Sequence, residues 1–346
     1  MTDVHVVLPG DIDDPAAPSG GNGYDRRVCL GLSALGWTVR EHPVPGGWPY
    51  PGGAERAELA RLLAAVPDGA AVLLDGLVAS AVPDVLVPQA RRLRLTVLVH
   101  LPLGEASPAL RAPERTALTA ATTIVATSGW TRRRLLDRYG LPAGRVHVAA
   151  PGVDAAPPVP GSAAGSALLC VAAVAPHKGH DRLVEALATV ADLPWTCGCV
   201  GSLDRDPVFA ARLRQQIDGY RLADRIALTG PRTGSALADS YAAADLLVHP
   251  SRGETYGMVV TEALARGIPV LATAADGLPE ALGWAPDGSR PGLLVPPDDP
   301  AALAGALRRW LGEPDLRAGL RRAALGRRTM LAGWDGTVAT IARILT

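Results

Sequence analysis

The stretch that decides the fold reads His249-Pro-Ser-Arg-Gly-Glu-Thr-Tyr-Gly-Met-Val-Val-Thr-Glu262. It joins a short apolar run, expected to be a strand, to a helix that we expect to begin near Gly257. Free N–H groups in the first turn of a helix, together with the positive end of its dipole, form an anion site. Glu254 lies in the loop and Glu262 in the second turn of the helix. Neither carboxylate can bind an anion, so we expect them to accept hydrogen bonds from hydroxyls on either side of a bound phosphate.

Outward from this loop, short apolar runs alternate with longer Ala-, Leu- and Arg-rich stretches of helical period. The expected strands of the first half are Val4–Leu8, Thr38–Glu41, Ala71–Leu74, Leu95–His100, Thr123–Ala126 and Val146–Ala149. Those of the second half are Leu168–Ala173, Trp195–Val200, Ile226–Leu228, Leu246–His249, Pro269–Ala272 and Gly292–Val295. Strands that alternate with helices form parallel sheets covered on both faces. The predicted fold class is therefore α/β, with two Rossmann-like doubly wound domains facing each other across a cleft.

The domain boundaries follow from a restart of this pattern after an Ala-, Pro- and Gly-rich segment. We expect an N-terminal domain over residues 1–154, a linker over 155–166, a C-terminal domain over 167–333 and a closing helix over 334–346. A length of 346 residues suits two domains. A content of 48% hydrophobic and 20% charged residues is typical of a globular protein.

Charge and hydropathy argue against several classes of partner. Lys and Arg together number 34, as do Asp and Glu, so no net field attracts nucleic acid or an anionic membrane. No uncharged apolar run is long enough for a transmembrane helix, and no signal-peptide pattern is present. We therefore expect a cytoplasmic protein without nucleic-acid or integral membrane contact. Arg132–Arg134 and Arg138 on one expected helix leave peripheral lipid contact open, although a solvated helix face is favoured.

Two patterns that could indicate metal binding are better explained otherwise. Cys197 and Cys199 lie on one face of an apolar run, as expected for a buried strand rather than a zinc or redox site. Asp11-Ile-Asp-Asp14 follows no strand that would fix two carboxylates on one face, so a solvated or acceptor-facing loop is favoured. We expect no metal and no cofactor.

In each half, one further motif follows the first strand. Lys178, in Val171-Ala-Ala-Val-Ala-Pro-His-Lys-Gly179, is the only lysine of the chain, and Asn22 is the only asparagine. A sequence that avoids a residue type yet keeps one copy suggests a need for that side chain, and a compact ammonium suits a phosphate oxygen. Asn22 lies in the Gly-rich stretch Ser19–Asp25, expected to be a turn that opens a helix and brings backbone amides close to a ligand.

These motifs resemble those of the family-4 retaining glycosyltransferases of the GT-B fold, also called glycosyl transferases group 1. Glu254 and Glu262 match the E-x7-E signature of the family, and the flanking segments Tyr241–Asp245, Glu262–Val270 and Gly277–Glu280 match as well. The resemblance is strong over residues 168–296 and loose over 1–154. It implies a UDP- or GDP-sugar donor, an acceptor hydroxyl of unknown identity, no requirement for a metal, and a closing helix that crosses back to the first domain.

The resemblance also implies roles for individual residues. Lys178 takes the place of the lysine that holds the donor diphosphate, but Ala173 replaces the arginine that shares this task, and Arg252 or Arg26 is a candidate substitute. His100 resembles a first-domain histidine that lies beside the transferred sugar, with a core histidine as the alternative. We predict three catalytic residues, Lys178, Glu254 and His100. The predicted substrate-binding residues are Gly21, Asn22, Gly23, Gly201, Arg252, Thr255, Tyr256, Gly257, Met258, Val259 and Glu262.

The function predicted on this basis is the metal-independent transfer of a hexose from a nucleotide-diphosphate sugar to an acceptor hydroxyl, with retention at the anomeric carbon. Three alternatives remain: a GT-B nucleotide-sugar epimerase, a non-catalytic nucleotide-sugar-binding protein, and a nicotinamide-dependent oxidoreductase. The last is disfavoured because a dinucleotide fingerprint starting at Gly21 would need glycine at the position of Arg26.

Overall fold

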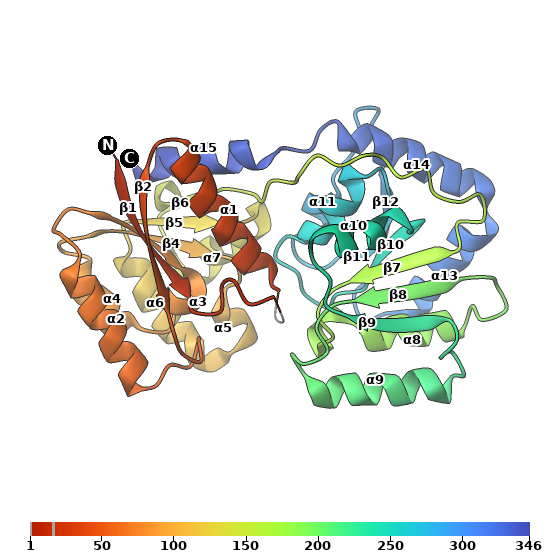
Figure 1. Cartoon of the computed structure of the whole chain (residues 1–346), viewed down its shortest axis with the longest axis horizontal. Coiled ribbons are helices and arrows are strands. Elements are labelled where there is room, and N and C mark those ends of the chain that lie inside the picture. Colours follow the sequence, from red (N-terminus) through yellow and green to blue (C-terminus); the bar gives the residue numbers. More distant parts are fainter. Residues whose placement is uncertain (1, 16–17) are drawn as a thin grey trace. The chain divides into compact units, whose positions relative to one another are not determined.

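The computed structural model describes residues 2–15 and 18–346, which form two compact units. The first unit combines residues up to Asp14 with Ser19–Gly152 and Ala332–Thr346, and the second consists mainly of Val153–Leu331. Each unit contains one six-stranded sheet flanked by helices (Figure 1). The predicted α/β class with two doubly wound sheets is confirmed.

The sheet of the first unit is parallel throughout and has the order β2-β1-β3-β4-β5-β6. Its strands are β1 (Asp3–Pro9), β2 (Thr38–Val44), β3 (Ala71–Asp75), β4 (Arg94–Val99), β5 (Thr123–Ala126) and β6 (Val146–Val148). Its helices are α1 (Gly20–Ala34), α2 (Gly53–Ala65), α3 (Gly76–Ala79), α4 (Pro83–Gln89), α5 (Leu103–Ala106), α6 (Arg111–Ala120), α7 (Gly129–Tyr139) and α15 (Trp334–Leu345). Every residue of β3 is buried, as expected for a parallel strand covered on both faces.

The helix α15 packs on the first unit beside α1, as the blue and red helices show in Figure 1. Gly31 lets the two helices approach, because a Cβ atom there would lie 2.3 Å from a methyl group of Val338. The Thr337 hydroxyl donates to the carbonyl of Ala150 at 2.7 Å, which fixes the start of the helix. The first unit is therefore completed by the C-terminal segment of the chain.

The sheet of the second unit is also parallel, with the order β12-β11-β10-β7-β8-β9. Its strands are β7 (Ala167–Val171), β8 (Thr196–Val200), β9 (Ile226–Gly230), β10 (Leu246–His249), β11 (Val270–Thr273) and β12 (Gly292–Val295). Its helices are α8 (His180–Ala188), α9 (Pro207–Gly219), α10 (Gly234–Ala242), α11 (Met258–Ala265), α12 (Leu278–Leu282), α13 (Pro300–Gly312) and α14 (Pro314–Arg328). Cys197 and Cys199 are buried free thiols in β8, in agreement with the buried strand predicted there.

Each sheet has one point at which its strand order reverses. These switch points lie between β1 and β3 in the first unit and between β7 and β10 in the second. In open parallel sheets, ligands bind beyond the carboxyl ends of the strands at such a point. Both units therefore present a candidate site at a position that the topology alone identifies.

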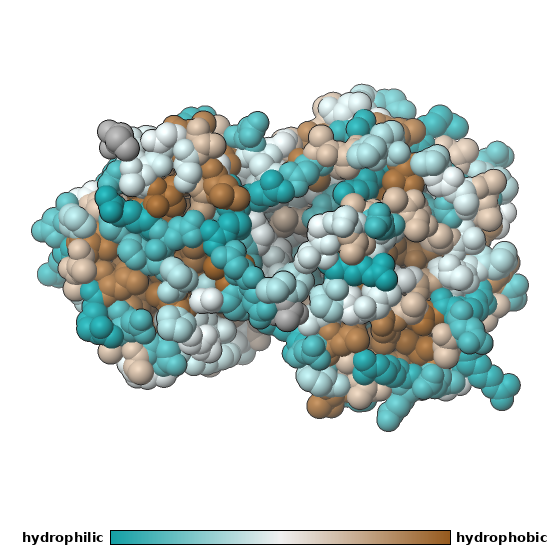
Figure 2. Space-filling model, viewed as in Figure 1, coloured by the Kyte–Doolittle hydropathy of each residue, from teal (hydrophilic) through white to brown (hydrophobic). Residues whose placement is uncertain are grey.

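The surface shows hydrophilic and hydrophobic residues interspersed over the face seen in Figure 2. Among the described residues, no helix combines the length and the apolar character needed to cross a membrane. Three of the four arginines of α7 are not simply solvated, contrary to the favoured prediction. Arg134 and Arg138 pair with Glu105 at 2.8 and 2.6 Å, and Arg132 donates to the carbonyl of Val146 at 2.8 Å.

The segment Ala155–Ser166, predicted as a linker, is bound to the second unit through Asp245 at the start of β10. The buried Asp245 carboxylate accepts from the Ser162 hydroxyl at 2.7 Å and from the Arg321 guanidinium at 2.8 Å. Burial alone would raise the pKa of Asp245, but the bonds from Ser162 and the charge of Arg321 outweigh it and lower the pKa. Ala-, Pro- and Gly-rich composition indicates a segment without helix or strand, and such a segment can still be fixed by its hydrogen bonds.

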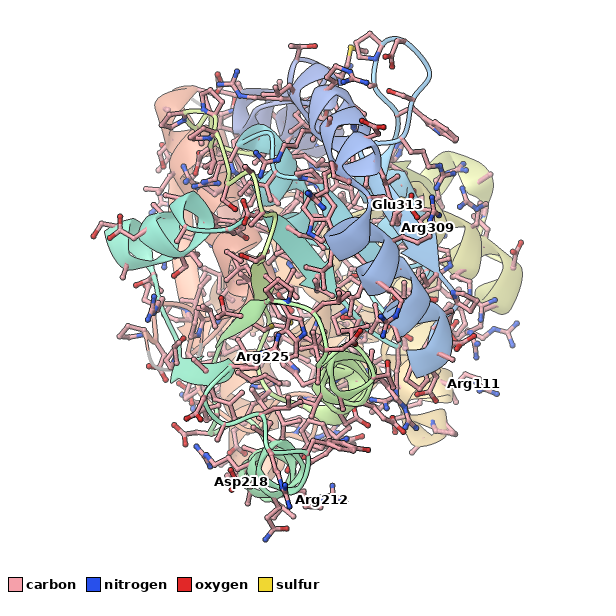
Figure 3. All side chains as sticks on the ribbon, turned by 90° about the vertical axis from the view of Figure 1, so that its right-hand side faces the viewer. Arg111, Arg212, Asp218, Arg225, Arg309 and Glu313 are labelled. Atoms are coloured by element: carbon pink, nitrogen blue, oxygen red, sulfur yellow. The ribbon has the colours of Figure 1, made fainter. Side chains whose placement is uncertain are left out.

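A second arginine holds the edge of the same sheet. Arg225, labelled in Figure 3, lies 3.7 Å from the ring centroid of Trp195 and donates to the carbonyls of Trp195 and Ala191 at 3.0 and 2.8 Å. A planar guanidinium can stack and donate at once, which an ammonium cannot do. This contact ties the residue before β9 to the segment that enters β8.

Candidate functional site

The switch point of the second unit brings together the cation and the carboxylate that the sequence predicts as catalytic. Lys178 ends a short 3-10 turn, Pro176–Lys178, that follows β7, and Glu254 lies in the loop after β10. Their Nζ and Oε2 atoms are 2.6 Å apart, and both side chains are largely buried. The Lys178–Glu254 ion pair is thus formed between loops whose strands are neighbours in the sheet.

Glu254 also contacts a histidine that sequence reasoning did not assign to the site. The Nε2 atom of His249 lies 3.2 Å from Glu254 Oε2, and its Nδ1 atom is buried without a hydrogen-bond partner among the described residues. The tautomer with its proton on Nε2 fits both observations, because Nε2 can then donate to Glu254 and Nδ1 has no hydrogen to donate. Burial alone would raise the pKa of Glu254, but the charge of Lys178 and the contact with His249 outweigh it and lower the pKa. Glu254 is therefore a carboxylate at neutral pH.

The loop turns into α11 at Gly257, where the predicted helix start and the observed one differ by one residue. Gly257 is the N-cap, with φ of 93°, and a Cβ atom there would lie 2.6 Å from the side chain of Leu278. Only glycine meets both conditions without strain. The backbone of Glu254 is held from the other side, since its N–H donates to Asp276 at 3.0 Å and its carbonyl accepts from Gly277 at 2.8 Å. The first-turn amides of α11, those of Met258 and Val259, have no acceptor within the helix.

Glu262 lies in α11 and is held by Tyr241. The Tyr241 hydroxyl donates to Glu262 Oε2 at 2.8 Å, and the Arg266 guanidinium lies 4.6 Å from the centre of the Tyr241 ring. Burial raises the pKa of Glu262, although the Tyr241 hydrogen bond acts against this. Because Tyr241 occupies one carboxylate oxygen, the other is left to accept from a ligand. The sequence motif includes Tyr241, but its spacing gives no sign of this contact.

The two arginines considered as substitutes for the family arginine are both engaged with carboxylates. Arg26 pairs with Asp13 at 2.6 Å and with Glu41 at 2.7 Å. Arg252 pairs with Asp181 at 2.7 Å and with Asp298 at 3.0 Å. Each guanidinium is thus paired with two carboxylates, and a role of Arg252 or Arg26 in binding the diphosphate stays a prediction.

The remaining predicted residues of the second unit surround the same strand ends. Thr255 and Tyr256 lie between Glu254 and the N-cap of α11. Burial raises the pKa of Tyr256 to about 12, so that its hydroxyl stays protonated. Gly201 directly follows β8, at a point where a Cβ atom would lie 1.9 Å from the carbonyl oxygen of Ala172. This glycine is required by the packing of the backbone, whatever its part in ligand binding.

The switch point of the first unit holds a buried acidic pair around His100. His100 Nε2 lies 2.7 Å from Asp25 Oδ1 and 3.6 Å from Asp75 Oδ2. Asp75 ends β3 and also accepts from the Leu77 N–H at 2.5 Å. Asp25 Oδ2 is buried without a hydrogen-bond partner in the described structure. One ligand atom from each of the three residues lies within 4.8 Å of the others, a spacing that would also suit a metal ion.

The Gly-rich stretch beside His100 is helical rather than a turn. The helix α1 begins at Gly20, and the hydroxyl of its N-cap Ser19 accepts from the N–H of Asn22 at 3.0 Å. Gly21 packs against His100, because a Cβ atom there would lie 3.3 Å from the imidazole ring. Asn22 donates from its side chain to the carbonyl of Asp11 at 3.2 Å. The predicted residues Gly21, Asn22 and Gly23 thus form the first turn of a capped helix.

Two family models match the chain, one for each unit. The model described as Glycosyltransferase Family 4 matches residues 2–156, and the model described as Glycosyl transferases group 1 matches residues 165–313. The chain belongs to the family-4 glycosyltransferases.

Two relatives of this family-4 glycosyltransferase are named D-inositol 3-phosphate glycosyltransferase. The one from Kineococcus radiotolerans is 36% identical over 65% of this chain and 57% of its own length. The one from Acidothermus cellulolyticus is 35% identical over 64% of this chain and 52% of its own length. The match therefore spans little more than half of either relative.

Solved structures of low identity share the fold. Sucrose-phosphate synthase from Thermosynechococcus elongatus has a TM-score of 0.79 at 23% identity and covers 99% of this chain and 98% of its own. HepE from Anabaena, solved in complex with UDP and glucose, has a TM-score of 0.79 at 18% identity and covers 100% of this chain and 99% of its own. The fold of this family-4 glycosyltransferase is therefore GT-B.

The pKa values of the acidic pair of this family-4 glycosyltransferase shift in the opposite direction from that of Glu254. Burial raises the pKa of Asp25 to about 7. Burial and the charge of Asp25 raise the pKa of Asp75, and burial lowers the pKa of His100. Among the described residues, no lysine or arginine forms an ion pair with either carboxyl. The pair therefore retains a proton at neutral pH.

This proton predicts how the stability of the first unit depends on pH. Because the folded-state pKa of Asp25 is raised, its contribution to stability is complete below about pH 4 and is lost as the pH rises through about 7. The wild-type protein should therefore lose stability in the first unit between about pH 5 and about pH 8. In Asp25→Asn, whose side chain cannot ionise, this loss should be smaller by a few kcal/mol (order of magnitude). Urea unfolding followed through methyl NMR signals of the first unit measures this loss.

The control is Asp84→Asn, which removes an exposed carboxylate that pairs with Arg56 at 2.8 Å. Its stability should follow the wild-type dependence on pH. An Asp25→Asn variant with an unchanged dependence would show that Asp25 is ionised in the folded protein.

Proposed function

We propose that this chain transfers a hexose from a nucleotide-diphosphate sugar to an acceptor hydroxyl, with retention at the anomeric carbon and without a metal. The observation that carries the proposal is the Lys178–Glu254 ion pair at the switch point, beside the N-terminus of α11. A cation and helix amides on one side suit a diphosphate. A carboxylate three residues before the helix N-cap suits the hydroxyls of an attached sugar.

In the proposed reaction, the acceptor oxygen forms a bond to the anomeric carbon as the bond from that carbon to the diphosphate oxygen breaks. The acceptor proton passes to an oxygen of the departing phosphate. Negative charge grows on the leaving diphosphate, and donors already fixed in place stabilise such charge most effectively. Lys178 offers three N–H donors, and Glu254 occupies one of them, so the others can bind phosphate oxygens. His100 is the proposed substrate-contacting residue of the first unit.

Two observations bear on the acceptor. The name of the relatives makes D-inositol 3-phosphate one candidate acceptor to test. The acidic loop Asp11–Asp14 favours a polar or cationic acceptor, although Asp13 is neutralised by Arg26. An epimerase and a non-catalytic binding protein remain the alternatives, because both would use the same diphosphate site.

Incubation with a panel of UDP- and GDP-sugars tests the reaction class. We expect slow release of free nucleoside diphosphate, accelerated by a suitable acceptor and nearly unchanged by EDTA. Appearance of an epimerised donor would favour the epimerase, and thermal stabilisation by donor without turnover would favour the binding protein. Loss of most activity in EDTA, restored by manganese or magnesium, would contradict a mechanism that relies on Lys178 and the helix amides.

The role proposed for Lys178 predicts a large loss on its removal. Lys178→Ala should lower turnover by roughly 100-fold, or about 3 kcal/mol, as for loss of one preorganised donor to a developing charge. Lys178→Arg should restore only part of this, because a planar fork does not place its charge where the ammonium does. Steady-state kinetics with the preferred donor measures both effects. Activity of Lys178→Ala within about threefold of wild type would remove Lys178 from the site.

The two glutamates should separate sugar recognition from nucleotide recognition. Glu262→Ala removes the proposed partner of the ribose hydroxyls and should weaken binding of the free nucleoside diphosphate by roughly ten- to a hundred-fold. Glu254→Ala should leave that affinity intact or slightly higher, because Lys178 loses its carboxylate partner, while turnover falls. Calorimetry with UDP and GDP on both variants measures the affinities.

The control for Glu262 is Tyr241→Phe, which removes the hydroxyl that donates to Glu262 and keeps the carboxylate. It should retain most of the affinity that Glu262→Ala loses. Equal losses of affinity in the two glutamate variants would contradict the assignment of the carboxylates. A loss of affinity confined to Glu254→Ala would reverse it.

A further inference from the structure

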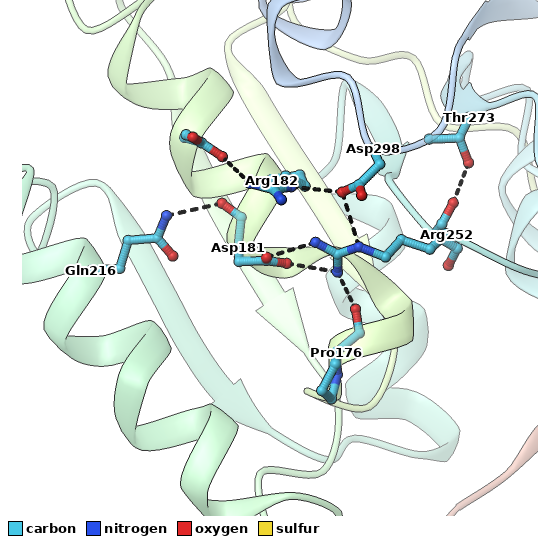
Figure 4. A network of polar contacts seen from close by, with 9 residues as sticks. Pro176, Asp181, Arg182, Gln216, Arg252, Thr273 and Asp298 are labelled. Carbon is cyan, nitrogen blue, oxygen red and sulfur yellow. Dashed lines mark hydrogen bonds and ion pairs between the residues drawn. The ribbon is translucent and has the colours of Figure 1, made fainter.

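Arg252 occupies the centre of a polar network in the second unit, shown in Figure 4. Its guanidinium donates to both oxygens of Asp181, at 3.0 and 2.7 Å, and to Asp298 at 3.0 Å. It also donates to the carbonyl oxygen of Pro176. The backbone N–H of Arg252 donates in turn to the carbonyl of His177 at 2.8 Å. One residue therefore binds three separate segments of the chain.

The turn among these segments and the loop of Arg252 itself carry the two members of the ion pair. Pro176 and His177 belong to the turn that ends at Lys178, and Arg252 itself is two residues before Glu254. Asp181 lies in the first turn of α8, directly after that turn, and Asp298 precedes α13. Arg252 thus ties the loop of Glu254 to the turn of Lys178 through contacts separate from the Lys178–Glu254 ion pair.

The network contains more negative than positive charge. Asp298 accepts from Arg182 at 2.7 Å as well as from Arg252, and Arg182 also pairs with Glu185 at 2.8 Å. Two arginines are thus matched by three carboxylates. Four of the five N–H donors of the Arg252 guanidinium are used within the network, and its excess of carboxylates disfavours the approach of a phosphate.

We propose that Arg252 is a positioning residue, which fixes the turn of Lys178 against the loop of Glu254 and thereby compensates for the missing arginine at Ala173. This inference rests on the proposed function of the Lys178–Glu254 site. Arg252 compensates by restricting the movement of the lysine that remains. A catalytic group misplaced by about 1 Å can cost about a hundredfold in rate, so restricting one lysine can replace part of a second cation.

The number of acceptors explains why an arginine stands at this position. Four oxygens surround the guanidinium in different directions, and its planar fork reaches them all at once. An ammonium has three donors on one atom and would leave at least one acceptor without a partner. Arg252→Lys should therefore keep the charge but lose the connection between the two loops.

The sole lysine of the chain provides a direct readout of position. Protein grown with isotope-labelled lysine contains one labelled side chain, that of Lys178. We expect its side-chain NMR signals to shift and to sharpen in Arg252→Met, because the ammonium becomes mobile when the turn is released. This measurement needs no substrate, so it tests the positioning role even if the proposed reaction proves wrong.

Asp181→Asn separates positioning from direct binding, because it weakens the network while leaving Arg252 in place. If Arg252 positions Lys178, this variant should lose affinity for the nucleoside diphosphate and shift the Lys178 signals. If Arg252 binds the diphosphate directly, releasing it from Asp181 should increase that affinity instead. An increase would overturn the proposal.

Kinetics and a matched control complete the test. Arg252→Met and Arg252→Lys should both lower kcat/KM for the donor by roughly ten- to a hundred-fold. Arg308→Met removes another bidentate pair of the same unit, that of Arg308 with Asp192, and should leave the Lys178 signals and the kinetics unchanged. Thermal unfolding confirms that the variants are folded. Unchanged Lys178 signals in Arg252→Met, or full activity in Arg252→Lys, would show that Arg252 does not position the lysine.

Discussion

The site of the second unit depends on holding one cation and one carboxylate together across two loops. Lys178 and Glu254 are 76 residues apart in the chain, and their charged atoms are 2.6 Å apart. The two loops start from β7 and β10, which pair with Leu168 opposite Leu246 and Leu169 opposite Leu247. A slip of one residue in this register would turn each strand's side chains to the other face of the sheet. The packing of the sheet core therefore determines the electrostatics of the site.

The buried carboxyls at the two switch points have pKa values shifted in opposite directions, because only Glu254 forms an ion pair with a lysine. Glu254 is buried beside Lys178, and its pKa falls. Asp25 is buried beside another carboxyl and a histidine, and its pKa rises to about 7. The same desolvation penalty acts on both carboxyls, and the partner decides the sign of the shift. One family-4 glycosyltransferase thus contains an acid fixed as an anion in one unit and an acidic pair that keeps a proton in the other.

The elements were predictable from the sequence because parallel strands buried on both faces are apolar runs with clear ends. The predicted ranges for β5, β10 and β12 coincide with the observed ones. Lys178, Glu254 and Glu262 could be predicted as site residues because helix starts and strand ends bring them to one place. Asp25 and Asp75 could not, because one lies in a helix and the other ends a strand, and only the strand order places them together. The glycines of Ser19–Asp25 favour a turn by propensity, but the Ser19 cap and the packing of Gly21 on His100 stabilise a helix instead.

The return of the chain to the first unit has a consequence for its synthesis. The surface of α1 that contains Gly31 is covered by Val338 of α15, and Val338 is translated after the whole second unit. During translation, all strands of the second unit are synthesised before α15 of the first unit. Until α15 is synthesised, this face of α1 is therefore uncovered. Exposed apolar surface of this kind favours aggregation and the binding of chaperones.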